Sequence, residues 1–363
     1  MIDRNQLRNI DWILIGLLVL NSLIGLAFIH SSSHHLYGNY ALKQLVWIVV
    51  SLSALFLFLS VNYRSLVNYS FYFYVVTVSI LAGVLLFGTL TSGAKSWIVL
   101  PFFWIQPSEI AKIIVILVLA NIFSNYKREY LTVGQALLSS LFVFAPVVLI
   151  ALQPDLGTAL TYIPILMSAF ILAGMGRKTL IILVILGLLI GIVGWSVFLK
   201  DYQKERITTL VSPEKDPLGA GYHSIQSKIA IGSGGFLGKG YKKGTQSQLR
   251  FLPARHTDFI LSVIGEEFGF MGVVTMLLCY FLFLSRLFQS VIKARDRTGV
   301  YIIFMVALTI TFQFGINVFM TIGLFPIAGV PLPLVSYGGS SLLTNYLAVS
   351  LVLNVKMRRF VNV

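Results

Sequence analysis

Long, uninterrupted apolar runs restrict what this chain can fold into. The run "DWILIGLLVLNSLIGLAFIH" at positions 11–30 is the first of them, and about 20 apolar residues are what an α-helix needs to cross the hydrocarbon core of a bilayer. The composition agrees, because 57% of the residues are hydrophobic and 11% are charged, whereas roughly 25% charged residues are usual in a soluble domain. We therefore expect an all-α integral membrane protein.

The apolar runs predict ten transmembrane helices in a single polytopic membrane domain, residues 1–363. They cover about residues 11–30, 41–60, 67–90, 108–124, 134–152, 156–174, 179–199, 258–284, 300–325 and 337–355. A long connection, residues 200–257, separates the seventh run from the eighth. We expect it to be an extracytoplasmic loop within the membrane domain.

The positions of the basic residues predict the orientation. An even number of spans places both termini on one side, and the short connections and span mouths on the other side hold only Lys43, Lys95 and Lys112. The residues assigned to the terminal side are Arg4, Arg8, Arg64, Lys127, Arg128, Arg177, Lys178, Arg286, Lys293, Arg295, Arg297, Lys356, Arg358 and Arg359. Short cytoplasmic loops carry the excess of Lys and Arg, so both termini are predicted to be cytoplasmic.

The remaining basic residues all fall in the outer loop, in a chain whose formal net charge is +14. They are Lys200, Lys204, Arg206, Lys215, Lys228, Lys239, Lys242, Lys243, Arg250 and Arg255. An outward basic surface does not suit genomic nucleic acid, so no nucleic-acid partner is expected, but it suits the anionic headgroups of membrane lipids. An ordinary solvated loop is the alternative for any single lysine.

Three carboxylates stand at the head of the eighth run, in "RHTDFILSVIGEEFGF" at 255–270. Along a helix Asp258 and Glu266 would lie roughly 12 Å apart, which exceeds the roughly 5 to 9.5 Å between the two carboxyls of a glycosidase. They are therefore not expected to form a hydrolytic pair. Small residues share the helical face of Asp258, which predicts that it faces the bundle. The alternative is that Asp258 caps the helix N-terminus.

Two further strings place charge near the outer ends of predicted spans. In "WIQPSEIAK", residues 104–112, Pro107 fits a first helical turn and Glu109 and Lys112 share one side, which predicts an ion pair. The Lys112 ammonium could instead hold a phosphate. In "QPDLGTAL", residues 153–160, Asp155 is expected to be the N-cap of a helix.

Glycine and proline mark two irregular segments. "GSGGFLGKG", residues 232–240, does not have the phosphate-loop spacing; a flexible turn is expected, with a pyrophosphate cradle of glycine N–H groups as the alternative. "GLFPIAGVPLPLVSYGGSS", residues 323–341, breaks two spans. Irregular backbone at membrane depth must be buried or line a watery cavity, so we expect a substrate cavity open to the outer face. His30, His34 and His35 do not form a convincing ligand set, and no metal site is predicted.

Several of these strings resemble one family. "QPSEIAK", "QPDLGTAL", "IQSKIAIGSGGFLGKG", "GTQSQLRFLPARHTDFILSVIGEEFGF" and "GLFPIAGVPLPLVSYGGSSLL" are similar to the SEDS proteins (shape, elongation, division and sporulation), in the same order and over most of the chain. "GTQSQLRFLP" is closer to the rod-shape members than to the division members. The resemblance implies a multi-pass protein of the bacterial cytoplasmic (inner) membrane with the same number of spans.

The resemblance also implies an activity and a set of residues. SEDS proteins are peptidoglycan glycosyltransferases that polymerise lipid II, the undecaprenyl-pyrophosphate-linked disaccharide-peptide, and work with a class B penicillin-binding protein, a transpeptidase. By similarity Asp258 is the catalytic residue, and Glu109 and Lys112 form a required ion pair. Asp155, Gln226, Ser233, His256 and Glu267 lie in strings associated with the substrate cavity. Arg255 stands where other members often carry an acidic residue, which leaves its role open.

The mechanism we expect is inverting glycosyl transfer, with Asp258 as general base. Lys112 and basic residues of the outer loop would offset the charge on the departing undecaprenyl pyrophosphate, and a divalent cation such as magnesium is a cofactor that the sequence neither requires nor excludes. A lipid II flippase is the main alternative, because many spans and broken helices also describe transporters. A non-catalytic scaffold for the penicillin-binding protein is the third possibility.

Overall fold

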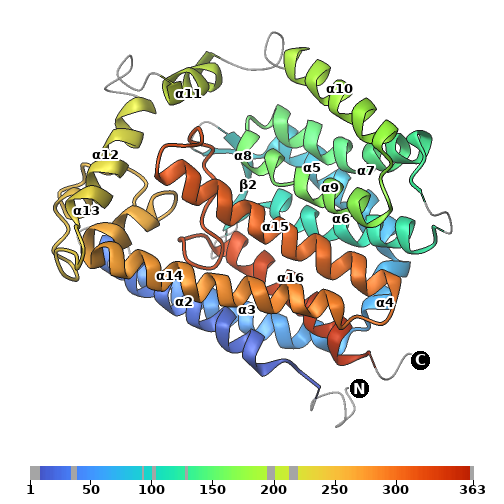
Figure 1. Cartoon of the computed structure of the whole chain (residues 1–363), viewed down its shortest axis with the longest axis horizontal. Helices are drawn as coiled ribbons and strands as arrows, with labels where there is room; N and C mark the ends of the chain where they lie inside the picture. Colours follow the sequence, from blue (N-terminus) through green and yellow to red (C-terminus); the bar gives the residue numbers. More distant parts are fainter. Residues whose placement is uncertain are drawn as a thin grey trace.

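The computed structural model describes residues 9–33, 39–91, 94–99, 104–126, 130–193, 201–211 and 220–359, and most of them are helical (Figure 1). The helices are α2 (Trp12–Ser33), α3 (Tyr40–Ser60), α4 (Tyr63–Asn68), α5 (Ser70–Phe87), α6 (Pro107–Ser124), α7 (Val133–Leu152), α8 (Leu156–Leu160), α9 (Ile163–Leu172), α10 (Arg177–Val193), α11 (Asp201–Val211), α12 (Ala220–Ser233), α13 (Thr245–Gln248), α14 (Ile260–Ile292), α15 (Arg297–Thr321) and α16 (Gly339–Met357). Six of the predicted loop and terminal basic residues lie outside the described residues: Arg4, Arg8, Lys127, Arg128, Lys200 and Lys215.

Seven helices in the described part of the chain are long and apolar enough to cross a membrane: α2, α3, α5, α6, α7, α14 and α15. The other three predicted runs coincide with α8 plus α9, with α10 and with α16. The run 156–174 is interrupted at Thr161 and Tyr162, just before Pro164 in the first turn of α9. α16 is less apolar because it carries buried polar side chains such as Asn345 and Asn354.

The helices pack as one bundle. α14 packs along α2 and α15, α16 packs along α3, and α15 also contacts α6 and α9, as the crossing ribbons in Figure 1 show. Small residues permit these close approaches: a Cβ at Gly25 of α2 would lie 2.2 Å from the carbonyl oxygen of Val335. Within the long non-helical segment 322–338, which the prolines predicted, residues 332–336 are buried among the helices, whereas Ile322 and Leu324 are exposed.

An ionic cluster joins three helix ends on one side of the bundle. Asp11, directly before α2, accepts hydrogen bonds from Nε and Nη2 of Arg286 at 2.8 and 3.1 Å and pairs with Lys356 in the last turn of α16. The start of α2 and the ends of α14 and α16 therefore lie on the same side. That arrangement requires an even number of crossings between α2 and α16.

A small antiparallel sheet connects α5 to α6, a feature that the all-α expectation did not include. Its strands are β1 (Thr89–Thr91), β2 (Ala94–Val99) and β3 (Trp104–Ile105), in the order β1-β2-β3. β3 leads into α6, which begins at Pro107 as predicted. The carbonyl of Trp104 accepts a hydrogen bond of 2.9 Å from the Ser340 hydroxyl, so the sheet fixes the start of α6 against the start of α16.

The described part of the predicted outer loop is folded rather than extended. α12 and α13 pack against α14 near its N-terminal end, and α11 contacts α12, away from the ionic cluster (Figure 1). Glu266 of α14 holds this region: it pairs with Lys239 at 2.9 Å and accepts the N–H groups of Gln246 and Ser247 at 2.7 and 2.9 Å.

The glycine-rich turn 232–240 is packed against α14, and the pyrophosphate-cradle interpretation of it is wrong. Its N–H groups already have partners, because those of Lys239 and Gly240 donate to the carbonyls of Glu266 and Glu267 at 3.0 and 2.9 Å. Gly269 interrupts the regular geometry of α14 where the glycine-rich turn packs against it. Its φ is +63°, a conformation that glycine adopts without strain.

Gly234 tests this contact, because a Cβ there would lie 1.9 Å from the carbonyl oxygen of Gly265. We expect Gly234→Ala to lower the free energy of unfolding by about 1–3 kcal/mol, the usual cost of overpacking, and to lower the midpoint of thermal unfolding in detergent. Gly232→Ala is the matched control, since a Cβ at Gly232 meets nothing within 4 Å, and it should leave the midpoint unchanged or raise it. Equal midpoints for the two variants would contradict the contact.

Candidate active site

Asp258 lies in a turn directly before α14. Its N–H donates to the carbonyl of Ala254 at 3.0 Å, and its side chain is partly exposed. The N-cap of α14 is Phe259, with no side-chain hydrogen bond to the helix. The alternative in which Asp258 serves as the helix cap is therefore wrong. The small-residue face of α14 contacts a neighbouring helix, because the Ser262 hydroxyl lies 2.8 Å from that of Ser227 in α12.

The surroundings of this turn change the titration of its side chains. Burial raises the pKa of the Asp258 carboxyl to about 6, although the Arg206 guanidinium and a hydrogen bond from Thr257 act in the opposite direction. Burial, together with the charge of Arg255, lowers the pKa of His256 to about 4. Near neutral pH, Asp258 is thus a carboxylate that readily accepts a proton, and the His256 imidazole is uncharged.

The neighbours of His256 and Arg255 tie the turn to other helices. The His256 ring lies 4.8 Å from that of Tyr40 and 5.7 Å from that of Tyr337, between centroids. Arg255 is buried, and its Nε donates to the carbonyl of Ser32 at the end of α2 at 2.7 Å. Arg255 therefore has a structural contact that no sequence pattern indicated.

The non-helical segment 327–330 lies opposite Asp258. A Cβ at Gly329 would come within 4.0 Å of Asp258 Oδ2, and Gly329 has a φ of +66°. Arg206 of α11 donates to the carbonyl of Ile327 at 3.2 Å, which brings a guanidinium to the same place. On the other side of the segment, a Cβ at Gly157 of α8 would lie 2.0 Å from the carbonyl oxygen of Ala328. The segment thus connects the surroundings of Asp258 to α8.

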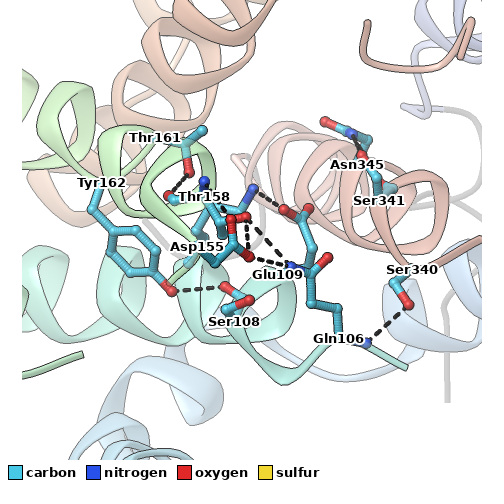
Figure 2. A network of polar contacts seen from close by, with 11 residues as sticks. Gln106, Ser108, Glu109, Asp155, Thr158, Thr161, Tyr162, Ser340, Ser341 and Asn345 are labelled. Atoms are coloured by element: carbon cyan, nitrogen blue, oxygen red, sulfur yellow. Dashed lines mark hydrogen bonds and ion pairs between the residues drawn. The ribbon is translucent and has the colours of Figure 1, made fainter. Parts of the chain in front are cut away.

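A second polar cluster surrounds Asp155 and includes the predicted ion pair (Figure 2). Asp155 caps α8 as predicted, accepting from the Thr158 N–H at 3.1 Å and from the Thr158 hydroxyl at 2.9 Å. Gln106 Nε2 also donates to Asp155, at 2.7 Å. Lys112 Nζ lies 2.7 Å from Glu109 Oε1, and both side chains are buried, so the ion pair is confirmed.

This cluster joins three helices. The Tyr162 hydroxyl donates to the carbonyl of Ser108 at 2.7 Å, and the Gln106 N–H donates to the Ser340 hydroxyl at 3.1 Å. Figure 2 shows residues of α6, α8 and α16 around Asp155. Burial raises the pKa of Asp155, with the two hydrogen bonds from Thr158 opposing it. The structure thus holds this acid inside a polar network.

The other candidate residues are more dispersed. Glu267 accepts hydrogen bonds from the Ser31 hydroxyl and from Gln248 Nε2, and it is buried. The Ser233 hydroxyl donates to Ala230 within α12, at 2.9 Å. Gln226 has a buried Oε1 without a hydrogen-bond partner. The contacts of Glu267 join α2 and α13 to α14 and are structural, which differs from the cavity role implied for it.

Sequence reasoning missed three residues around the site: Gln106, Arg206 and Asn317. Gln106 stood inside a quoted string, but only its neighbours were considered. Arg206 was one of many loop cations, and nothing in the sequence distinguished it. Asn317 stood in an apolar run that holds one other amide, Gln313; an amide side chain among hydrophobic residues was the available signal.

Within the described ranges, no three His, Cys, Asp or Glu side chains converge as metal ligands; His30 contacts the Tyr241 hydroxyl at 3.0 Å, and His34 and His35 lie outside those ranges. A cavity of about 350 Å³ lies beside Arg295–Arg297, roughly 30 Å along α15 from its C-terminal end. The outward substrate cavity stays a prediction.

Comparisons with known proteins give one family. Residues 9–360 match the model of the FtsW, RodA and SpoVE family, described as "Cell cycle protein". The peptidoglycan glycosyltransferase MrdB of Escherichia coli K12 is 39% identical over 288 residues, 79% of this chain and 78% of that protein. A structure described as "Structural coordination of polymerization and crosslinking by a peptidoglycan synthase complex" contains a similar chain, with a TM-score of 0.83 and 34% identity over 97% of this chain and 98% of that one. The crystal structure of Thermus thermophilus RodA is similar with a TM-score of 0.73 and 29% identity, over 97% of this chain and 98% of that one.

The Glu109–Lys112 pair generates a stability prediction. Lys112→Met leaves the Glu109 carboxylate buried without its cation, and we expect it to lower the free energy of unfolding by about 3–5 kcal/mol. The double variant Glu109→Gln, Lys112→Met removes both charges and should recover most of that loss. Thermal unfolding of the detergent-purified proteins measures both effects, and a double variant no more stable than the single one would contradict the buried pair.

Proposed function

This chain belongs to the cell cycle protein family of FtsW, RodA and SpoVE, and on that premise we propose that it is an inverting peptidoglycan glycosyltransferase. It polymerises lipid II into β-1,4 glycan strands at the outer face of the bacterial cytoplasmic membrane, during cell elongation. The observation that carries the proposal is Asp258: a partly exposed carboxylate with a pKa of about 6, before α14, with a guanidinium nearby.

Asp258 acts as the general base of the reaction. It takes the proton from the 4-hydroxyl of one lipid-linked sugar as that oxygen forms a bond to the anomeric carbon of the N-acetylmuramoyl unit on another chain. The bond from that carbon to the pyrophosphate oxygen breaks, and the undecaprenyl pyrophosphate leaves with the electron pair. Attack from the opposite face inverts an α-linked pyrophosphate into a β-1,4 linkage. A positioned base typically contributes 10²- to 10⁴-fold in rate.

Charge compensation for the leaving group falls to Arg206 rather than to Lys112. The Lys112 ammonium is buried against Glu109, so it is not available as the phosphate ligand that the sequence suggested. Arg206 is exposed and acts on Asp258 through its charge. Its guanidinium can therefore donate hydrogen bonds to a pyrophosphate bound near Asp258.

The proposed topology has ten spans, with both termini in the cytoplasm and Asp258 toward the outer face. The ionic cluster of Asp11, Arg286 and Lys356 supports the even number of crossings. Within this topology, α8 with α9, α10 and α16 complete the set begun by the seven longer apolar helices. Residues 200–257 form the extracytoplasmic loop, whose helices cover the site.

A class B penicillin-binding protein is the proposed partner, since crosslinking must follow polymerisation. The similar chain that comes from a peptidoglycan synthase complex supports this. Lipid II is the proposed substrate, held between the outer loop and the segment 327–330. Asp155 and His256 stay candidate substrate-binding residues, with Gln226 and Ser233 as outer-loop candidates.

A polymerisation assay with purified protein and lipid II in detergent tests the function. We expect Asp258→Asn to reduce glycan synthesis by at least about 10²-fold, because the amide cannot accept the proton. Asp296→Asn is the matched control: Asp296 caps α15 at the other end of the bundle, and its loss should spare the rate. Equal polymer from Asp258→Asn, or none from the unaltered protein, would favour a flippase or scaffold.

The pH dependence gives an independent test. The base works only when deprotonated, so kcat/KM should rise with pH through about 6, the pKa of Asp258, and then reach a plateau. Arg206 lowers this pKa, so Arg206→Gln should move the rising limb to higher pH. Initial rates of lipid II polymerisation between pH 4.5 and 8.5 measure both, over roughly two pH units on each side of the limb. A limb that stays in place in Arg206→Gln would contradict the assigned charge interaction.

A further inference from the structure

Three successive carbonyls of the turn that carries Asp258 are held by the C-terminal part of the chain. The carbonyl of His256 accepts the Tyr337 N–H at 2.9 Å, and that of Thr257 accepts the Ser336 hydroxyl. The carbonyl of Asp258 itself accepts from Asn317 Nδ2 at 2.9 Å. The main chain of the turn is therefore fixed from outside its own segment, at each residue in succession.

Asn317 makes the central contact of this set. It lies in α15 and is fully buried. Its amide nitrogen has two hydrogens, and the second donates to the carbonyl of Val330 at 2.8 Å. Both acceptors are carbonyl oxygens, so the NH₂ group and not the amide oxygen must face them. The amide oxygen is buried without a partner, which indicates that the two donated bonds determine the side chain's position.

These two bonds set the separation between the carboxylate and the segment that faces it. Val330 follows Gly329, the residue opposite Asp258 Oδ2. One amide thus connects the backbone of Asp258 to the backbone of the facing segment. With its carbonyl held, the Asp258 carboxylate can move only by side-chain rotation, and small displacements of a reacting group of about 1 Å can cost about 10²-fold in rate.

We propose that Asn317, together with Ser336, is a positioning residue for Asp258: the buried amide and the hydroxyl hold the main chain of the catalytic turn at a fixed distance from segment 327–330. The inference rests on the proposed function and adds residues to its site. Asn317 touches no substrate in this proposal; it acts through the backbone. Its loss changes the rate of the chemical step more than the binding of lipid II.

Asn354 provides a matched control. It is also buried in a helix, and its Nδ2 also donates to two backbone carbonyls, those of Phe58 and Val61 at 3.2 and 2.6 Å. It lies in the last turns of α16, on the side of the ionic cluster and away from Asp258. Asn317→Leu and Asn354→Leu therefore each remove two hydrogen bonds donated to backbone carbonyls, at opposite ends of the bundle. Asn354→Leu removes more, because Asn354 Oδ1 also accepts from the Tyr63 N–H at 3.3 Å and from Arg358 Nε at 3.0 Å.

The experiment measures kcat and KM for lipid II polymerisation, with thermal unfolding of each protein. We expect Asn317→Leu to lower kcat by about 10- to 10²-fold, with KM changed less than about threefold. Asn354→Leu should lose at least as much thermal stability while keeping kcat. Ser336→Ala, a smaller change, should also lower kcat. If Asn317→Leu cannot be purified in a folded state, Ser336→Ala is the variant that tests the positioning role.

Two results would overturn the inference. One is an unchanged kcat in Asn317→Leu, or in Ser336→Ala if Asn317→Leu does not fold. The other is a variant whose KM for lipid II rises while its kcat stays the same. Failure of the proposed function is recognised separately, because it would appear as absent polymerisation by the unaltered protein or as full activity of Asp258→Asn. If the unaltered protein is active and Asp258→Asn is not, a kcat effect no larger than that of Asn354→Leu counts against the positioning role alone.

Discussion

The non-helical segment between α15 and α16 depends on one constraint: lipid offers no hydrogen bonds, so every backbone group at membrane depth needs a partner within the protein. Buried side chains supply several of them. Asn317 donates to Val330, Gln44 donates to Ser336 at 3.4 Å, and the Tyr280 hydroxyl donates to Pro333 at 3.3 Å. The turn of Asp258, α8 and Arg206 all pack against this segment. The candidate site exists because the break in the two helices is stabilised from the surrounding bundle.

The environments of the acids separate their roles. Glu109 is buried beside Lys112, and Glu266 is buried beside Lys239 and two backbone N–H groups. Through these contacts, both carboxylates hold other elements in place. Asp258 is partly exposed, with a guanidinium near it. Different environments allow carboxylates to have a structural role at one position and to accept a proton at another.

Sequence reasoning was most accurate where the determinant was local. The apolar runs located the long helices, Pro107 marked the start of α6, and the spacing of Glu109 and Lys112 predicted their ion pair. It failed where a residue's partner lay far along the chain. Glu267, placed in the cavity by resemblance, is bound to Ser31 and Gln248. N–H groups of the glycine-rich turn donate to carbonyls of α14 or of residues 231–234. The sheet before α6 and the helices of the outer loop also went unpredicted, because short elements there depend on what they pack against.

The sequence by itself determined that the chain is a membrane protein, where its long helices run, and which strings resemble a known family, because hydrophobic length and local spacing are properties of neighbouring residues. The tertiary structure decided which acids are fully buried, such as Glu266, and which stay partly exposed, such as Asp258. It also decided that the charge of Arg206 acts on Asp258 while Lys112 is paired with Glu109, and that an amide from α15 donates to the carbonyl of Asp258. Burial and hydrogen-bond partners arise from contacts between distant segments, which no local pattern records.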